Sequence, residues 1–168
     1  MPHVILVAIG ANLPASDGTP PLMACRRAVE QLARLPGLRL VAVSRWYRTP
    51  PDPPSDQPPY VNGVALLAAD AMPDPADLLG RLHAIEASAE RQRSVANAAR
   101  TLDLDLIGID AMVRDAPDPI LPHPRAHLRA FVLRPLCDVR PDWVHPRLGL
   151  AARDLLAGLE DTAEPIEA

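Results

Sequence analysis

Leucine and aspartate alternate strictly between residues 102 and 106, and this short run constrains the fold more than any other stretch. A period of two is the period of a β-strand, so the leucines are predicted to face one side and Asp103 and Asp105 the other. Aspartate is disfavoured in strands and costly to bury, so its face must meet water or a cation. Mg²⁺ commonly takes one or two carboxylates together with substrate phosphates. An edge strand with one wet face also carries acidic residues by chance, so this stretch alone leaves both interpretations open.

Length and composition indicate an ordinary soluble domain. With 168 residues, 48% of them hydrophobic and 23% charged, the chain can bury one core. Residues 1–160 are expected to form a single domain, followed by an acidic, disordered tail over 161–168. The net charge of −4 gives no indication of a nucleic-acid partner. No signal peptide or membrane span is evident, so we expect a cytoplasmic protein with no membrane partner. We also expect a monomer.

The order of predicted elements favours an α+β fold. Apolar periodicity predicts strands over 4–9, 38–47, 60–68 and 101–106, and helices over 21–35, 73–91, 125–136 and 148–159, with Pro135 marking the strained end of the third helix. The order strand–helix–strand–strand–helix–strand predicts a ferredoxin-like α/β sandwich with an antiparallel sheet and additional C-terminal helices.

A segment dense in proline connects the second and third predicted strands. Its six prolines lie between residues 50 and 59 and cannot donate ladder hydrogen bonds. An inert linker or a ligand for a proline-binding module is one interpretation, but the length suits a loop within one domain. Asn62 lies just beyond this segment, inside a predicted strand, where a polar side chain requires a structural or functional explanation.

Four separated motifs resemble one enzyme family. They are Ile9 to Leu13; Tyr47 to Pro51 with Asp56 to Asn62; Arg100 to Asp105; and Pro122 to Pro124 with Arg129 to Leu136. In this order they resemble 6-hydroxymethyl-7,8-dihydropterin pyrophosphokinase, which moves a diphosphoryl group from ATP to a pterin alcohol in folate biosynthesis. The likeness covers residues 4–136.

The resemblance implies where ATP and metal bind. Asp103 and Asp105 correspond to a pair that holds two Mg²⁺ ions bridging the ATP phosphates, in agreement with the strand argument. The implied catalytic set adds three arginines to this pair, namely Arg91, Arg93 and Arg100. The implied ATP-binding set is Glu86, Arg91, Arg100, Leu106, His123 and Arg129. Each of these residues also has a structural alternative. The arginines could be ordinary surface residues, Glu86 could lie on a solvated helix face, and His123 could be an ordinary loop histidine.

The resemblance also implies a pterin pocket. Its residues would be Thr49, Pro50, Pro51, Tyr60, Asn62 and Phe131. Aromatic rings can grip a flat heterocycle while an amide reads its donor and acceptor edge. The two aromatic residues could equally be ordinary core residues.

The chain departs from the family pattern in the loop before the aspartates. Family members commonly carry Trp-Gly-Pro-Arg there, whereas this chain has Asn97-Ala98-Ala99-Arg100 and a loop that is one residue shorter. Three functions therefore stay open at this point. They are a Mg²⁺-dependent diphosphokinase, slow if the altered loop closes poorly over the substrates; a divergent paralogue that binds a pterin or nucleotide with weak or no transfer; and an enzyme acting on a different pterin alcohol.

Overall fold

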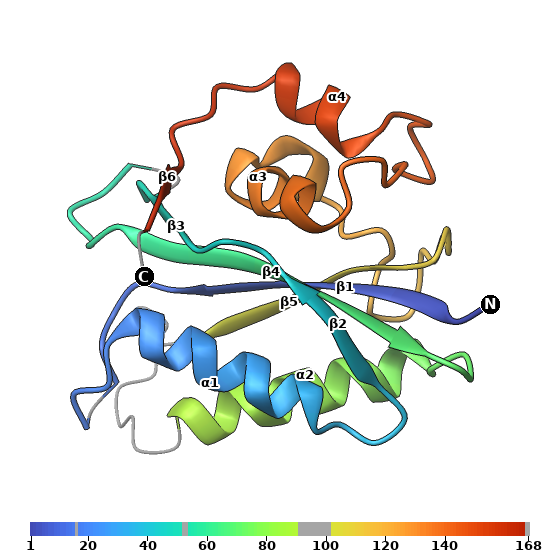
Figure 1. Ribbon diagram of the computed structural model, residues 1–168, viewed down its shortest axis with the longest axis horizontal. Coiled ribbons are helices and arrows are strands. Elements are labelled where there is room, and N and C mark those ends of the chain that lie inside the picture. The colour runs from blue at the N-terminus through green and yellow to red at the C-terminus, as the bar shows by residue number, and fades with distance from the viewer. Residues whose placement is uncertain (16, 52–53, 91–101, 167–168) are drawn as a thin grey trace.

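A six-stranded antiparallel sheet lies between two layers of helices (Figure 1). The computed structural model describes the chain except residues 16, 52–53, 91–101 and 167–168. Its elements are β1 (His3–Ala11), α1 (Pro21–Ala33), β2 (Arg39–Val43), β3 (Tyr47–Thr49), β4 (Tyr60–Ala69), α2 (Pro75–Glu90), β5 (Asp103–Ile109), a 3₁₀ turn (Ala126–Leu128), α3 (Ala130–Val139), α4 (Ala152–Ala157) and β6 (Glu164–Pro165).

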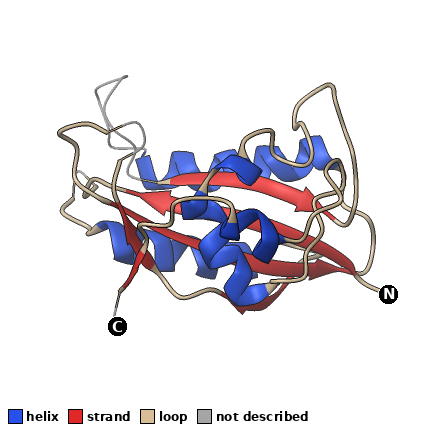
Figure 2. Ribbon diagram, turned by 90° about the horizontal axis from the view of Figure 1, so that it is seen from above, coloured by secondary structure: helices blue, strands red, loops and turns tan. Residues whose placement is uncertain are grey.

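The strand order confirms the predicted ferredoxin-like topology. The sheet runs β5-β1-β4-β3-β6, and β2 also pairs with β4. The long central pair β1·β4 is in continuous register from His3 opposite Ala69 to Ala11 opposite Val61. Helices α1 and α2 cover one face, while α3 and α4 cover the other as additional C-terminal elements (Figure 2). The two predicted helices of the core motif thus lie together, as the βαββαβ order requires.

Strand parity divides the core into two clusters. On the α1 and α2 side, alternate residues of β1, namely Ile5, Val7 and Ile9, pack with the helices. On the α3 and α4 side, Leu6 of β1 packs with Leu133 and Leu136 of α3. A sheet covered on both faces explains why β1 reads as a continuous apolar run rather than an alternating one.

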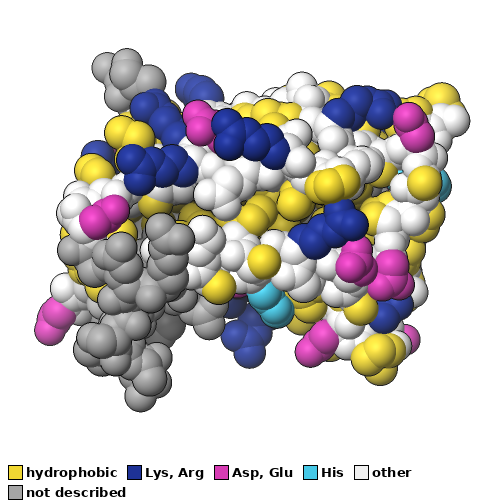
Figure 3. All heavy atoms as spheres, turned by 90° about the horizontal axis from the view of Figure 1, so that it is seen from below, with side chains coloured by type: hydrophobic (Ala, Val, Ile, Leu, Met, Phe, Trp, Pro, Cys, Tyr) yellow, Lys and Arg dark blue, Asp and Glu magenta, His cyan; other side chains and the backbone are white. Residues whose placement is uncertain are grey.

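The outer surface of the α1 and α2 layer carries charges of both signs. Arginine and acidic side chains are interspersed on this face (Figure 3). One pair lies within α2, where Arg81 Nε is 3.1 Å from Asp77 Oδ2 one turn earlier. Arg81 also donates to the carbonyl of Pro36 at 3.0 Å, which ties α2 to the turn after α1. Among the described helices, none has the length and apolar character needed to cross a lipid bilayer.

The second predicted strand is interrupted rather than continuous over 38–47. It divides into β2 and β3, which are separated by residues 44–46, although the Ser44 amide still donates to the Val64 carbonyl of β4 at 2.9 Å. Ser44 causes part of this break, because its Oγ donates to the carbonyl of Arg45 at 2.7 Å and accepts the Val64 amide at 2.9 Å. The Trp46 ring then lies over Gly63, where a Cβ atom would come within 2.5 Å of it. These contacts change the direction of the chain, so that β3 pairs with the first residues of β4.

The C-terminal elements differ from the predicted ones in several places. The helix predicted over 125–136 begins only at Ala130 and ends at Val139, because Ala126–Leu128 form a separate 3₁₀ turn and Arg129 is extended. Pro135 lies inside α3 rather than at its end, because its neighbours Leu133 and Leu136 are fully buried and anchor the turns on both sides. The last helix is short, since the segment before it pairs with itself through Val144 and Ala151. Within the tail that was expected to be disordered, Glu164 and Pro165 form β6 and pair with the edge of β3.

Candidate active site

The two aspartates lie on the open face of β5, as the alternation predicts. Leu102, Leu104 and Leu106 are buried against α1 and α2, whereas Asp103 and Asp105 are partly exposed on the opposite face. The facing residues of β1 are small, with Gly10 opposite Asp103 and Ala8 opposite Asp105. Small cross-strand partners leave space directly beside the carboxylates.

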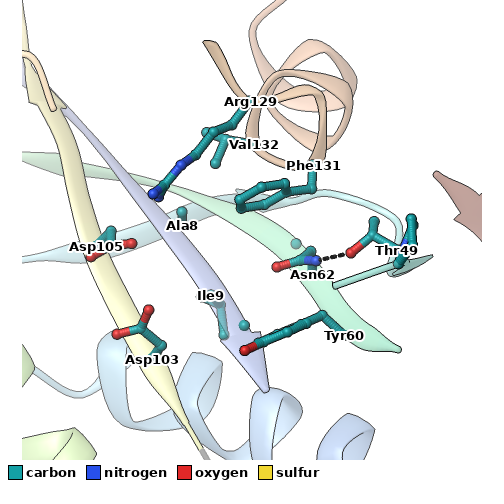
Figure 4. A pocket seen from close by; sticks show the side chains of 13 residues that line it. Ala8, Ile9, Thr49, Tyr60, Asn62, Asp103, Asp105, Arg129, Phe131 and Val132 are labelled. Carbon is teal, nitrogen blue, oxygen red and sulfur yellow. Dashed lines mark hydrogen bonds between the residues drawn. The ribbon is translucent and has the colours of Figure 1, made fainter. Parts of the chain in front are cut away.

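A single cavity of about 180 Å³ joins these carboxylates to the residues predicted to bind a pterin. Its lining from the sheet includes Ala8, Gly10, Thr49, Pro50, Tyr60, Asn62, Gly63, Asp103 and Asp105, and its lining from the α3 layer is Arg129, Phe131 and Val132. Strands β1, β3, β4 and β5 and the start of α3 therefore meet at one end of the sheet (Figure 4).

Asn62 is the buried polar centre of one half of the cavity. It is 7% exposed, and its Nδ2 donates to Thr49 Oγ1 at 2.5 Å. The amide has a further N–H hydrogen and an oxygen, which suits the reading of a heterocycle edge. In Figure 4 the rings of Phe131 and Tyr60 lie on opposite sides of Asn62. This arrangement fits a flat aromatic ligand held between two rings.

Gly10 is required beside this amide. A Cβ atom on Gly10 would lie 2.8 Å from Asn62 Oδ1, closer than real Cβ contacts allow. The motif from Ile9 to Leu13 contains this glycine, but no role for it was predicted from the sequence. The alternation of side chains along β1 could have indicated its role, because it places Ala8 and Gly10 on the same face of the sheet as the aspartates.

The substitution Gly10→Ala should therefore damage the pterin half of the site selectively. The new methyl group must displace the Asn62 amide, whose flexible end can move without disturbing the sheet. We expect the KM for the pterin to rise about tenfold, since loss of one hydrogen bond to a ligand is worth roughly 1–2 kcal/mol. The KM for ATP and the melting temperature should change little. Steady-state kinetics with each substrate varied in turn measures this, and Gly80→Ala, at an open position on α2, is the control.

Arg129 and Phe131 enter the cavity from the start of α3. Arg129 immediately precedes the helix in an extended conformation, with φ −120° and ψ 107°. Its Cζ lies 5.4 Å from the centre of the Phe131 ring, and the side chain runs along the cavity toward Asp105 (Figure 4). A guanidinium between an aromatic pocket and two carboxylates is placed to bind phosphate oxygens.

His123 lies at the carboxylate end of the site. Its Nε2 is 4.0 Å from Asp105 Oδ1, and its Nδ1 accepts the Arg125 amide at 3.1 Å. Burial and the neighbouring Arg129 lower the pKa of His123, although Asp103 acts in the opposite direction. The ring is therefore neutral near pH 7, and the bond to Nδ1 leaves its proton on Nε2, on the side of Asp105.

Glu86 supports the aspartate strand rather than lining the cavity. Its Oε2 accepts the amide of Leu104 at 2.8 Å, between the two aspartates on the outer edge of β5. The structural alternative for this residue, a solvated helix face, does not describe it, since Glu86 holds the edge strand. Its contact with ATP stays a prediction.

The family assignment follows from a comparison of the whole sequence with known families. The profile of the family described as 7,8-dihydro-6-hydroxymethylpterin-pyrophosphokinase (HPPK) matches residues 6–141. The chain belongs to this family. The matched residues include every described residue of the cavity.

Named relatives agree with the HPPK assignment over most of their length. The 2-amino-4-hydroxy-6-hydroxymethyldihydropteridine pyrophosphokinase of Pseudomonas aeruginosa is 43% identical over 82% of this chain and 81% of its own. The protein of the same name from Synechocystis is 35% identical over 96% of this chain and 78% of its own.

Solved structures of HPPK-DHPS from Plasmodium falciparum share the fold. One with SDX-DHP has a TM-score of 0.70 at 12% identity and covers 94% of this chain. The wild-type structure has a TM-score of 0.68 at 11% identity. This chain spans 45% and 41% of those two longer chains, and at this identity the likeness concerns the fold alone.

Several residues implied by the HPPK resemblance are not among the described residues that line the cavity. Arg91, Arg93 and Arg100 fall outside the described residues. The Leu106 side chain is 3% exposed in the core under α1 and α2, so its predicted contact with ATP would have to be made by its backbone. Pro51 lines a neighbouring hollow rather than the cavity itself.

Proposed function

We propose that this chain transfers the diphosphoryl group of ATP to the hydroxymethyl group of 6-hydroxymethyl-7,8-dihydropterin, giving AMP and the pterin diphosphate. The observation that carries the proposal is the shared cavity, in which the carboxylate pair and Arg129 lie beside the Asn62 pocket. The names of the HPPK relatives support the same substrate class.

The pterin half would position the acceptor. Tyr60 and Phe131 would hold the two faces of the ring system, while Asn62 would bind its polar edge. The Thr49 hydroxyl fixes the amide through the bond at 2.5 Å, so the recognition group is oriented before the ligand arrives. The hydroxymethyl group would then point along the cavity toward the aspartates.

The carboxylate half fits Mg²⁺ that arrives with ATP. Within the described residues no cluster of three or more His, Cys, Asp or Glu side chains is suited to a metal ion. Two carboxylates are instead the usual protein share of a Mg²⁺ site that phosphates and water complete. We infer that Asp103 and Asp105 would hold two Mg²⁺ ions, which neutralise phosphate charge when bound.

The chain's own cationic and donor groups would act on the phosphates. Arg129 would bind phosphate oxygens in two-point fashion, and the neutral His123 would donate from Nε2 on the same side. Catalysis would rest on alignment of the hydroxyl with the β-phosphorus and on charge stabilisation, and no protein nucleophile is needed.

Product analysis tests the proposal. The protein is incubated with ATP, Mg²⁺ and 6-hydroxymethyl-7,8-dihydropterin, and AMP is resolved from ADP by ion-exchange chromatography. AMP that forms only when the pterin is present is the expected result. ADP would indicate monophosphoryl transfer or ATP hydrolysis and contradict the proposal. A pterin that binds by calorimetry without any nucleotide product would favour the divergent binding paralogue.

A further inference from the structure

The C-terminal tail lies along the outside of the pterin pocket. After α4, the chain crosses the end of α3 and reaches the edge of β3 (Figure 1). Leu159 packs against the α3 cluster. Asp161 then fixes the path, because its Oδ2 lies 2.8 Å from Arg134 Nε on α3 and its Oδ1 accepts the Ala163 amide at 3.1 Å. The side chain of Asp161 is only 17% exposed.

The tail ends as a strand that completes the edge of the sheet. Pro165 lies opposite Tyr47 and Glu164 opposite Arg48, and the Ile166 amide donates to the Trp46 carbonyl at 2.8 Å. β3 has only three residues, and its other edge pairs with β4. A strand this short gains much of its order from its neighbours. Its first residue is also tied to α3, since the Tyr47 hydroxyl donates to Asp138 at 2.7 Å.

The tail pairs with the first two residues of β3 and faces the end of β3 that leads into the pocket across a second hollow. Thr49 and Pro50, together with Phe131, line the active-site cavity on one side. On their other side lies a second hollow of about 370 Å³, and its far wall is made by the tail residues Leu159, Glu160, Thr162 and Ala163. The wall of the pterin pocket is therefore a thin layer between two hollows.

We propose that residues 158–166 are a positioning strap that holds the Thr49–Pro50 wall against the bound pterin. The inference rests on the proposed function. The strap touches neither substrate and acts through β3, whose Thr49 hydroxyl orients Asn62. Loss of the strap should loosen the pterin pocket while leaving the carboxylate half intact, because β5 lies at the opposite edge of the sheet.

The matched pair Ile166→Pro and Ile166→Ala tests the strap. Proline removes the one N–H that donates to Trp46, whereas alanine keeps it and removes only the side chain. We expect Ile166→Pro to raise the KM for the pterin about tenfold, since small displacements of a positioning wall are costly. The KM for ATP and kcat should stay within about twofold, and Ile166→Ala should resemble the unaltered protein.

Three further variants keep the test decisive if proline disturbs folding. A chain truncated after Leu159 should show the same selective loss, while a chain truncated after Ile166 should not. Asp161→Asn should give a smaller loss in the same direction. An unchanged pterin KM in folded strap variants would overturn the proposal, as would a parallel fall in both substrate affinities and kcat. Pterin-dependent AMP formation by the unaltered protein is scored separately, so failure of the strap would not be confused with failure of the proposed function.

Discussion

Replacement of Asp105 by asparagine is expected to lower pterin-dependent AMP formation by at least about 10³-fold, as is the same change at Asp103. Loss of one preorganised charge-stabilising group commonly costs about 10²–10³ in rate, and each of these carboxylates would serve a metal ion as well. Both carboxylates lie on the same open face of β5 beside Ala8 and Gly10, so no other described carboxylate lining the cavity can replace them.

The melting temperature should show that the loss of activity in these variants does not result from unfolding. Asparagine keeps the shape of the side chain and removes one of two like charges on the same strand face, which are expected to repel each other. The melting temperature should therefore be unchanged or slightly raised while activity is lost. Asp70→Asn is the control, since that side chain is 85% exposed at the other end of β4. Near-normal turnover in both Asp103→Asn and Asp105→Asn would refute the metal assignment.

Removal of the Asn62 amide should produce the second large effect, confined to the pterin. In Asn62→Ala the ligand loses its polar partner and the Thr49 hydroxyl loses the donor at 2.5 Å. An unpaired buried polar group costs roughly 1–3 kcal/mol, so the KM for the pterin should rise by about 10–100-fold. The KM for ATP should stay within about twofold, because Arg129 and the aspartates are untouched.

Thr49→Val distinguishes direct recognition by Asn62 from a purely structural role. Valine removes the hydroxyl that orients the amide but leaves the amide itself in place. We expect a loss in pterin affinity that is smaller than for Asn62→Ala, measured by calorimetry with the pterin alone. If Asn62→Ala weakened ATP and pterin binding equally, Asn62 would be a structural residue of the sheet and not part of a pterin pocket.

Much of the fold was predictable because strong periodic signals agreed with the tertiary structure. Alternation at residues 102–106 assigned each side chain of β5 to the correct face, since a strand has only two faces to choose between. The run from Tyr60 onward likewise predicted β4 to within one residue of its end.

The features that escaped prediction depend on contacts distant in sequence. The break between β2 and β3 depends on Ser44 bonding to Val64 and on the Trp46 ring lying over Gly63. The two-residue strand β6 contains a proline and has no strand signal of its own. It forms because the edge of β3 is available, which no local pattern in the tail indicates.

The candidate site likewise contains residues whose role the sequence could predict and residues whose role it could not. Asp103 and Asn62 were recognisable because polar residues in strands require a partner or a function. Gly10 was not assigned a role, because its importance arises from its distance to Asn62 on another strand. The hydrogen bond from the Leu104 amide to Glu86 could not be predicted, because the helical pattern around Glu86 does not show which strand the helix faces.

The most direct test of the single active site uses a paramagnetic metal. Mn²⁺ is added to the protein with a non-hydrolysable ATP analogue and the pterin, and the relaxation of the pterin protons is followed by nuclear magnetic resonance. If Asp103 and Asp105 hold the metal beside the Asn62 pocket, Mn²⁺ will broaden the bound pterin resonances, and Asp105→Asn will remove the broadening while pterin binding persists. A bound pterin whose resonances stay sharp with Mn²⁺ and the analogue present would contradict the account, because metal and pterin would then occupy separate sites.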